Sequence, residues 1–504
     1  MHEADGDPTA NVAATTAELP ASAPVRDRNR SSVFWILLGL ILAGGLAIRM
    51  YGVLEYRELC GGVPPPPPGE CPAEDFRVWG DPLFYHVQGR LLADGEGFID
   101  PYRSLYDEIR EPTANHPPLY GLFLAGITLL GGETPTAHRL ASTVLGTATV
   151  LVLALLARRL IGDRAGIATA AVVAVYPALW VNDYLLLSET MAAFLIAVAL
   201  FATYRFTATP SVRRAAVMGA AMAAAALGRA ELALLVPLVV VPLCWLLLAR
   251  WREMLCGLAA AGLAALAVTG PWMAFNLNRF EEPTLLSSGL GLNLSAGSCD
   301  LAWYGEYMGW YFCSYQGDPA RGPDEVEVVE DGVLGPEPTG DQSERDVVVR
   351  RHALDYIGDH IERAPLVAAT RVGRMWFVYK PGQTEWLDGT IEGRGAGAAE
   401  LVRWSSYFMT AAAVVGLVVM RRQRITILPV VGLVVTVSIA AALTFGIPRY
   451  RVPADVGLAF AAGIGLAWLF DRVVKPRGGA DESPAVVVRE PDPRPEMTPE
   501  PGRA

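Results

Sequence analysis

Ionisable side chains that can do chemistry stand at a few points in an otherwise apolar chain. Asp81 follows a glycine and precedes a proline, so a sharp turn presents its carboxylate either as a general base or as the cap of the next helix. His116 precedes two prolines, where an imidazole can contact a phosphate, help to ligate a metal or simply begin a helix. Both residues are candidates for an active site, and each has a structural alternative.

Two further segments carry charge where the surrounding sequence is apolar. Glu189 lies within an apolar stretch, where an ionised carboxylate persists when it is paired, used in function or stabilised by a helix dipole. Arg449 and Arg451 flank Tyr450 between two apolar runs. Their guanidinium groups suit a phosphate, which accepts forked, charge-assisted hydrogen bonds, although contact with lipid headgroups is the alternative.

The elements that must position these residues are long apolar runs. Apolar residues make up 52% of the chain and charged residues only 18%, and the apolar residues cluster in blocks of the length that crosses a bilayer. We therefore predict an all-α polytopic membrane protein with about ten transmembrane helices and two large extracytoplasmic loops. The ten predicted runs are residues 33–53, 137–157, 165–182, 184–204, 213–228, 231–249, 254–274, 401–420, 425–446 and 452–471.

The positive charges next to these runs predict their orientation. Clusters of Arg and Lys occur at every second connection, from residues 26–30 to residues 472–477, and cytoplasmic ends retain such clusters. Both ends of the chain are then cytoplasmic, and the pair Arg449 and Arg451 falls on the outer side as an exception to the rule. The net charge of −11 comes mainly from the outer loops, which argues against binding of nucleic acid.

Composition and the apolar runs together divide the chain into five parts. A short apolar run within residues 112–132 is predicted to be an interfacial or re-entrant helix, because about 14 residues do not span a bilayer comfortably. The predicted parts are a disordered cytoplasmic tail (1–32), an N-terminal transmembrane module (33–274) with a first extracytoplasmic loop (54–136), a large extracytoplasmic loop (275–400), the C-terminal transmembrane helices (401–471) and a second disordered tail (472–504).

The cysteines support the same sidedness. Four of the six lie in the predicted outer loops as close pairs, Cys60 with Cys71 and Cys299 with Cys313, and we predict two disulfides. A metal site is the alternative for these four residues, but no histidine accompanies them closely.

In this order along the chain, the polar motifs resemble those of the GT-C glycosyltransferases, in the branch of the protein O-mannosyltransferases and the aminoarabinose transferases, which depend on a phospholipid carrier. The resemblance extends over most of residues 33–471. The motifs that carry it are Gly80-Asp81-Pro82 with Tyr85, Leu91-Leu92-Ala93-Asp94-Gly95, His116-Pro117-Pro118-Leu119-Tyr120, Ser188-Glu189, Gly228-Arg229 with Glu231, and Pro448-Arg449-Tyr450-Arg451-Val452-Pro453.

The resemblance implies an inverting transfer of a sugar from a polyprenyl-phosphate donor to an acceptor hydroxyl. It implies no obligatory cofactor, although a divalent metal held by Asp81, His116 and Glu189 remains open. The acceptor is a glycan, a glycolipid or a protein, and the implied location is a bacterial plasma membrane that the chain crosses several times, with the active site outside. The implied roles are a catalytic base for Asp81, a supporting acid for Glu189, donor-phosphate binding for Arg449, Arg451 and Arg229, and a substrate pocket for Tyr85, His116, Tyr120 and Tyr450.

Two alternatives and one departure limit what the resemblance implies. A noncatalytic membrane scaffold for envelope assembly would use Asp81 only as a helix cap, and a secondary transporter would place its polar residues near the middle of the bilayer. The eukaryotic mannosyltransferases have a second acid directly after the catalytic one, whereas Pro82 occupies that position here.

Overall fold

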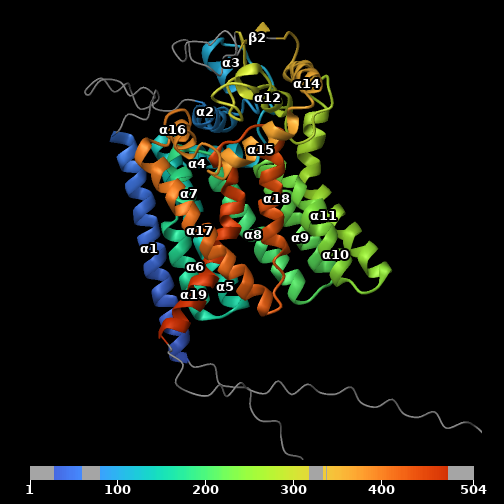
Figure 1. Ribbon diagram of the computed structural model, residues 1–504. Helices are drawn as coiled ribbons and strands as arrows, with labels where there is room; N and C mark the ends of the chain where they lie inside the picture. Colours follow the sequence, from blue (N-terminus) through green and yellow to red (C-terminus); the bar gives the residue numbers. More distant parts are fainter. Residues whose placement is uncertain (1–27, 59–79, 317–332, 337, 475–504) are drawn as a thin grey trace, which may run out of the picture.

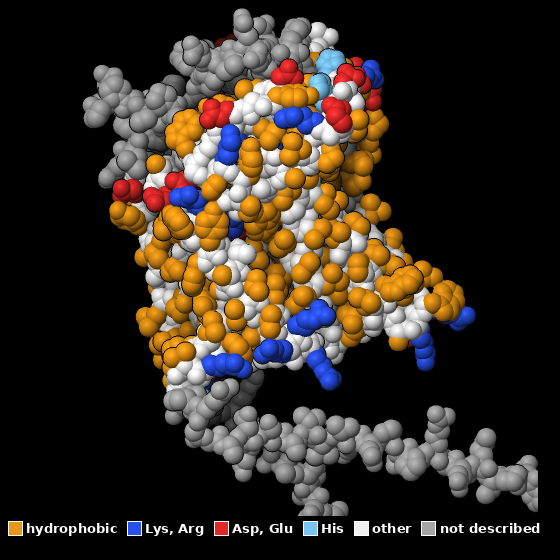
Figure 2. Space-filling model, viewed as in Figure 1, with side chains coloured by type: hydrophobic (Ala, Val, Ile, Leu, Met, Phe, Trp, Pro, Cys, Tyr) orange, Lys and Arg blue, Asp and Glu red, His pale blue; other side chains and the backbone are white. Residues whose placement is uncertain are grey.

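The computed structural model describes residues 28–58, 80–316, 333–336 and 338–474. Over these residues the chain forms a bundle of long helices, and short helices and loops cover its upper end in Figure 1. Basic side chains line the lower end of the bundle on the face shown in Figure 2, and the acidic side chains of that face gather at the upper end. The two ends of the bundle therefore differ in charge, as the sequence predicts.

All ten predicted apolar runs coincide with helices, and the predicted all-α polytopic membrane fold is confirmed. Seven helical segments of the described residues are long and apolar enough to cross a membrane, and the bent pair α6 and α7 makes an eighth. The seven are α1 (Arg28–Glu58), α5 (Pro135–Leu160), α8 (Ser188–Ala208), the combined run of η2 (Ala230–Leu234), η3 (Val236–Val240) and α10 (Val241–Leu247), α11 (Trp251–Leu277), α17 (Ala396–Arg422), and η5 (Pro448–Arg451) with α19 (Val452–Val474). The other two runs form shorter helices, α9 (Val212–Gly228) and α18 (Leu428–Leu443).

Two breaks interrupt the helices of the bundle. Between α6 (Asp163–Val175) and α7 (Pro177–Leu185) the chain bends by 47°, because Pro177 has no N–H for the helical ladder. Between α9 and η2, Arg229 adopts an extended conformation with φ −151° and ψ 120°. Helix α9 therefore ends at Gly228, and the Arg229 side chain reaches Glu189 at the start of α8 (Ser188–Ala208).

The short elements of the upper end come from two segments that are far apart in the sequence. Gln342 accepts hydrogen bonds from the Ala114 N–H and the Thr113 hydroxyl, and Arg279 donates to the carbonyls of Phe98 and Thr113. The two predicted outer loops are thus joined into one cap. Its elements are α2 (Asp81–Ala93), α3 (Pro101–Tyr106), α4 (Leu119–Leu129), α12 (Leu290–Ser295), α13 (Asp300–Trp303), α14 (Gln342–Asp359), α15 (Ala364–Met375), α16 (Pro381–Thr390), and the parallel strands β1 (Ser314–Gln316) and β2 (Val333–Pro336).

One of the two predicted disulfides is confirmed, between Cys299 and Cys313 in the cap. The other predicted pair, Cys60 and Cys71, lies outside the described residues. Cys244 and Cys256 are free.

Replacing Cys299 and Cys313 together by Ser is expected to lower the apparent melting temperature of the purified protein. The bond closes a loop with a sequence separation of 14 residues, for which the loss of chain entropy in the unfolded state is worth about 3 kcal/mol. Thermal unfolding in lipid nanodiscs would measure the effect. Cys256→Ser is the matched control, and an unchanged melting temperature in the double variant would show that the bond adds no stability.

Candidate functional site

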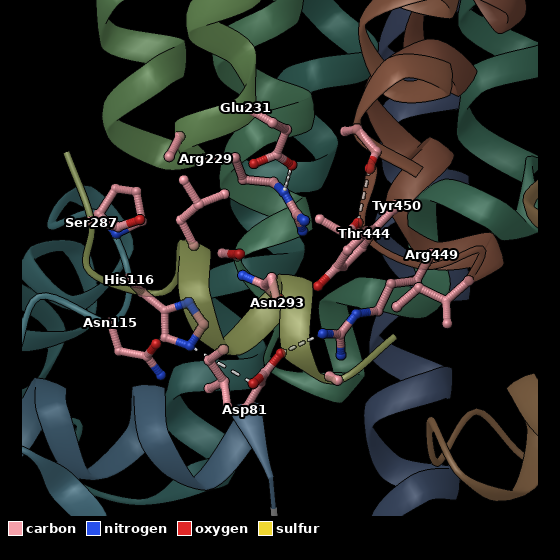
Figure 3. A pocket seen from close by; sticks show the side chains of 18 of the residues that line it. Asp81, Asn115, His116, Arg229, Glu231, Ser287, Asn293, Thr444, Arg449 and Tyr450 are labelled. Carbon is pink, nitrogen blue, oxygen red and sulfur yellow. Dashed lines mark hydrogen bonds and ion pairs between the residues drawn. The ribbon is translucent and has the colours of Figure 1, made fainter. Parts of the chain in front are cut away.

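Arg449 lies at the centre of a cluster of carboxylates that come from three different parts of the chain. Figure 3 shows its pair with Asp81. Its guanidinium group pairs with Asp81 at the start of α2, with Glu189 at the start of α8 at 3.3 Å, and with Glu392 just after α16 at 3.0 Å. One cation is thus shared among three anions at the end of the bundle where the cap meets the long helices.

The local sequence explains why Asp81 faces this cluster. Gly80 occupies the N-cap position of α2 with a positive φ of 59°, which a residue without a Cβ adopts readily, and Pro82 fixes the first turn. Asp81 is therefore the first residue inside the helix and is not its cap. Its carboxylate points instead toward Arg449 and toward the His116 imidazole, whose Nε2 lies 3.7 Å from Asp81 Oδ1.

Glu189 links Arg449 to a second arginine. The Arg229 guanidinium pairs with Glu189 and with Glu231, and it lies 4.6 Å from the centre of the Tyr450 ring. The Glu189 side chain is only 1% exposed, and its two cationic partners make that burial tolerable. The helix dipole is therefore not the sole partner of this buried carboxylate.

All of these charged groups except Glu189 line the polar end of a cavity of about 1110 Å³. Asn115, His116 and Asn293 add neutral polar groups to the same end (Figure 3). The opposite arm of the cavity is mainly apolar and is lined by residues of the second half of α9 and the second half of α11. Side chains that line this arm include those of Met222, Ala223, Ala226, Val236, Ala265 and Met273.

The charges set the protonation states at the polar end. Burial alone would raise the pKa of Asp81, but the positive charges of Arg449 and Arg229, joined by His116 when its ring is protonated, outweigh burial and hold the pKa below its usual value. Burial lowers the pKa of His116, helped by the two arginines and opposed by Asp81. At neutral pH Asp81 is therefore a carboxylate and His116 is a neutral imidazole.

Tyr85, His116 and Tyr450 line the cavity, as predicted for a pocket, but Tyr120 does not. The Tyr120 ring is fully buried behind Tyr85, with ring centres 4.9 Å apart, and its hydroxyl is hydrogen-bonded to Ser142 at 2.9 Å. The prediction that Tyr120 contacts substrate is therefore corrected. It supports the Tyr85 ring from behind.

The predicted role of Arg451 in binding phosphate is also corrected. Its side chain is 1% exposed and forms an ion pair with Asp455 one turn along α19, at 2.8 Å. The same guanidinium group donates to the Tyr176 hydroxyl at the break between α6 and α7. The consecutive turns of η5 and α19 direct Arg449 and Arg451 to different places, so Arg449 reaches the cavity and Arg451 binds the bundle together.

Two polar residues of the site were missed by sequence reasoning. Glu392 lines the cavity and pairs with Arg449, and the Tyr311 hydroxyl donates a hydrogen bond to Glu392 at 2.5 Å. Both residues lie in irregular parts of the cap, where no helical or strand pattern indicates their direction. A carboxylate in a Gly-rich stretch carries no local signal of a buried partner.

The described residues contain no group of three or more His, Cys, Asp or Glu side chains that is placed to hold a metal ion. Asp81 and His116 are close enough to share a ligand, but Glu189 is bound by the two arginines. The three residues therefore do not form a common site in this arrangement.

Comparison with known proteins finds a similar family over the central part of the chain. Residues 115–275 match the model of a family described as dolichyl-phosphate-mannose-protein mannosyltransferase. The resemblance to GT-C glycosyltransferases is confirmed. The matched segment includes His116, Glu189 and Arg229 of the cluster, and Asp81, Glu392 and Arg449 lie outside it. A comparison with curated protein sequences finds no match.

Solved GT-C structures also match the chain. ArnT from Cupriavidus metallidurans bound to undecaprenyl phosphate is 17% identical, and the match covers 87% of this chain and 60% of ArnT with a TM-score of 0.42. The Archaeoglobus fulgidus oligosaccharyltransferase tethered with an acceptor peptide is 13% identical, covering 86% of this chain and 50% of that protein with a TM-score of 0.45. The chain thus spans between half and two thirds of the length of these two proteins.

Proposed function

We propose that this protein is an inverting glycosyltransferase that moves a sugar from a polyprenyl-phosphate donor to an acceptor hydroxyl on the extracytoplasmic face of a bacterial plasma membrane. One observation carries the proposal: an ionised Asp81, paired with Arg449, stands at the polar end of a cavity whose other arm is apolar and reaches into the bundle. A donor with a charged headgroup and a hydrocarbon tail is divided in the same way into a polar and an apolar part. The matched family description names such a lipid-linked sugar.

Asp81 supplies the general base in this proposal. Its carboxylate takes the proton from the acceptor hydroxyl as that oxygen forms a bond to the anomeric carbon of the donor sugar. The bond from the anomeric carbon to the phosphate oxygen breaks on the opposite face, and the electron pair leaves with the lipid phosphate. The products are the inverted glycoside and a polyprenyl phosphate.

Arg449 and Arg229 stabilise the leaving phosphate. Both guanidinium groups lie beside the Tyr450 ring at the polar end of the cavity, where negative charge builds up as the bond to the phosphate breaks. Arg449 also faces Asp81, so a phosphate that binds Arg449 competes with Asp81 for the same cation. Donor binding then releases the carboxylate for the proton that it must accept.

The apolar arm holds the first isoprene units of the donor. Ala226→Trp is expected to raise the KM for a long-chain donor by about 10-fold or more, because the indole fills space that the tail needs. A water-soluble short-chain donor should be affected less. The control is Ala259→Trp on the exposed face of α11. If Ala226→Trp changes the KM for the long-chain and the short-chain donor by the same factor, the tail does not lie in this arm.

The decisive experiment is transfer from a panel of radiolabelled polyprenyl-phosphate sugars by the purified protein in nanodiscs, with glycan, glycolipid and peptide acceptors. Release of polyprenyl phosphate together with a labelled product of inverted configuration would support the proposal and identify both substrates. A protein that binds no donor and transfers no sugar would favour the envelope scaffold. Movement of a solute across the bilayer of proteoliposomes would favour the transporter.

A further inference from the structure

Glu392 and Tyr311 form a partly buried pair at the edge of the cavity, and the mechanism above gives this pair no role. The Glu392 side chain is 3% exposed. One carboxylate oxygen accepts the hydrogen bond of the Tyr311 hydroxyl at 2.5 Å, and the other lies 3.0 Å from Arg449 Nη1. Burial and the neighbouring Glu392 charge hold the pKa of Tyr311 well above its ordinary value, so its hydroxyl keeps the proton that it donates.

The segment that carries Glu392 is fixed to the bundle. Arg394 donates to the Asn182 side chain on α7 at 3.2 Å and lies 3.6 Å from the Asp388 carboxylate on α16. The Tyr184 hydroxyl donates to the Arg394 carbonyl at 3.3 Å. These buried contacts hold Glu392 in place independently of whatever occupies the cavity.

Glu392 therefore has a different relation to Arg449 from that of Asp81. Asp81 is 31% exposed and faces the open cavity, where a phosphate competes with it directly, whereas Glu392 lies buried beside the opposite nitrogen of the guanidinium group. A donor phosphate can replace the first contact without disturbing the second. Arg449 then stays in place while its partner changes.

We propose that Glu392, oriented by Tyr311, is a positioning residue that anchors Arg449 while the donor phosphate displaces Asp81 from it. This inference rests on the proposed function and assigns the regulation of the same site. Donor binding converts Asp81 from an ion-paired carboxylate into a free base, so the base becomes active only when the donor is present. The negative charge of Glu392 limits how tightly Arg449 holds either Asp81 or the phosphate.

The expected behaviour follows from the charges that face each group. Asp81 is faced by Arg449, Arg229, His116 and Glu189, and Arg449 is the dominant cation. Removing the Glu392 charge leaves Arg449 with one anion fewer, so its pairs with Asp81 and with phosphate both strengthen.

Glu392→Gln retains an oxygen acceptor for the hydrogen bonds and removes the charge. We expect kcat to fall about 10-fold because Asp81 stays paired, and the donor KM to fall about threefold because the phosphate meets less negative charge. Tyr311→Phe should shift both constants in the same direction by a smaller factor. A merely structural role would lower kcat without improving KM, and that result, or a raised KM, would overturn the proposal.

The matched control is Glu385→Gln. Glu385 forms an ion pair with Arg403 between α16 and α17, outside the cavity. The substitution Glu385→Gln removes the same charge from the same part of the cap. Both kcat and the donor KM should therefore stay within twofold of the wild type. Tyr356→Phe controls for Tyr311→Phe, because the Tyr356 hydroxyl also donates to a carboxylate, that of Asp300.

A substrate-free measurement separates this inference from the proposed function. Carbodiimides react with protonated carboxyl groups, so the pH at which labelling of Asp81 declines, followed by peptide mass spectrometry, reports its titration. Glu392→Gln should move this pH downward and Arg449→Gln should move it upward. If these shifts appear and no donor is turned over, the anchoring of Arg449 stands and the proposed function fails. If sugar transfer occurs and Glu392→Gln shifts neither labelling nor the kinetic constants, the anchoring fails alone.

Discussion

Replacing Asp81 by Asn is expected to lower kcat for sugar transfer by about 10²- to 10⁴-fold and to leave the donor KM unchanged or lower. The amide cannot accept the proton of the acceptor hydroxyl, and positioned general bases contribute factors of this size. Arg449 loses a competing anion in this variant, so donor binding does not weaken. Initial rates over a range of donor concentrations would separate the two constants.

Asp94→Asn is the matched control for this variant. Asp94 is exposed at the C-terminal end of the same helix α2, and its replacement should preserve full activity. Expression, the Cys299–Cys313 bond and the melting temperature should be the same in both variants. Full transfer activity in Asp81→Asn would show that Asp81 is not the general base and that its role in α2 is only structural.

Bilayer physics made most of the fold predictable from the sequence. A helix that crosses hydrocarbon needs a long apolar run, and all ten runs found in this way are helical in the structure. The kink at Pro177 within the predicted run 165–182 was not foreseen, although proline gives a local reason for it. Apart from the short helix predicted within residues 112–132, which is α4 in the structure, the cap was predicted only as two loops. Its order comes from contacts such as that of Gln342 with Ala114, which join distant segments.

The candidate site was predictable to the extent that its residues are unusual for their surroundings. Asp81, His116, Glu189 and Arg449 stand out as polar groups beside apolar runs, and the structure brings all four together. The different roles of Arg449 and Arg451 could not be predicted from the sequence. Their side chains point in different directions only because of the turn of η5 into α19.

Chemically similar arginines two residues apart should therefore respond differently to the same substitution. Arg449 contacts the cavity, whereas Arg451 is buried against Asp455 and Tyr176 in the bundle. Arg451→Gln is expected to lower the melting temperature, because it leaves the Asp455 carboxylate buried without its cation. Arg449→Gln should lower the melting temperature less, because Asp81 is partly exposed, Glu189 keeps its pair with Arg229 and Glu392 keeps the hydrogen bond from Tyr311. Thermal unfolding of both variants in nanodiscs would test this difference.

Arg449→Gln is expected to lower kcat/KM for the donor by about 100-fold, the size of effect seen when one group that stabilises a developing anion is removed. The variant should also change the pH profile. Asp81 acts as a carboxylate, so activity is lost as the pH falls through its pKa, which Arg449 holds below the usual value. Without that cation the pKa rises, and the acidic limb of the kcat/KM profile must move to higher pH. Arg421→Gln, at the opposite end of the bundle, is the control. A loss of activity with an unmoved acidic limb would mean that Arg449 binds phosphate without setting the basicity of Asp81.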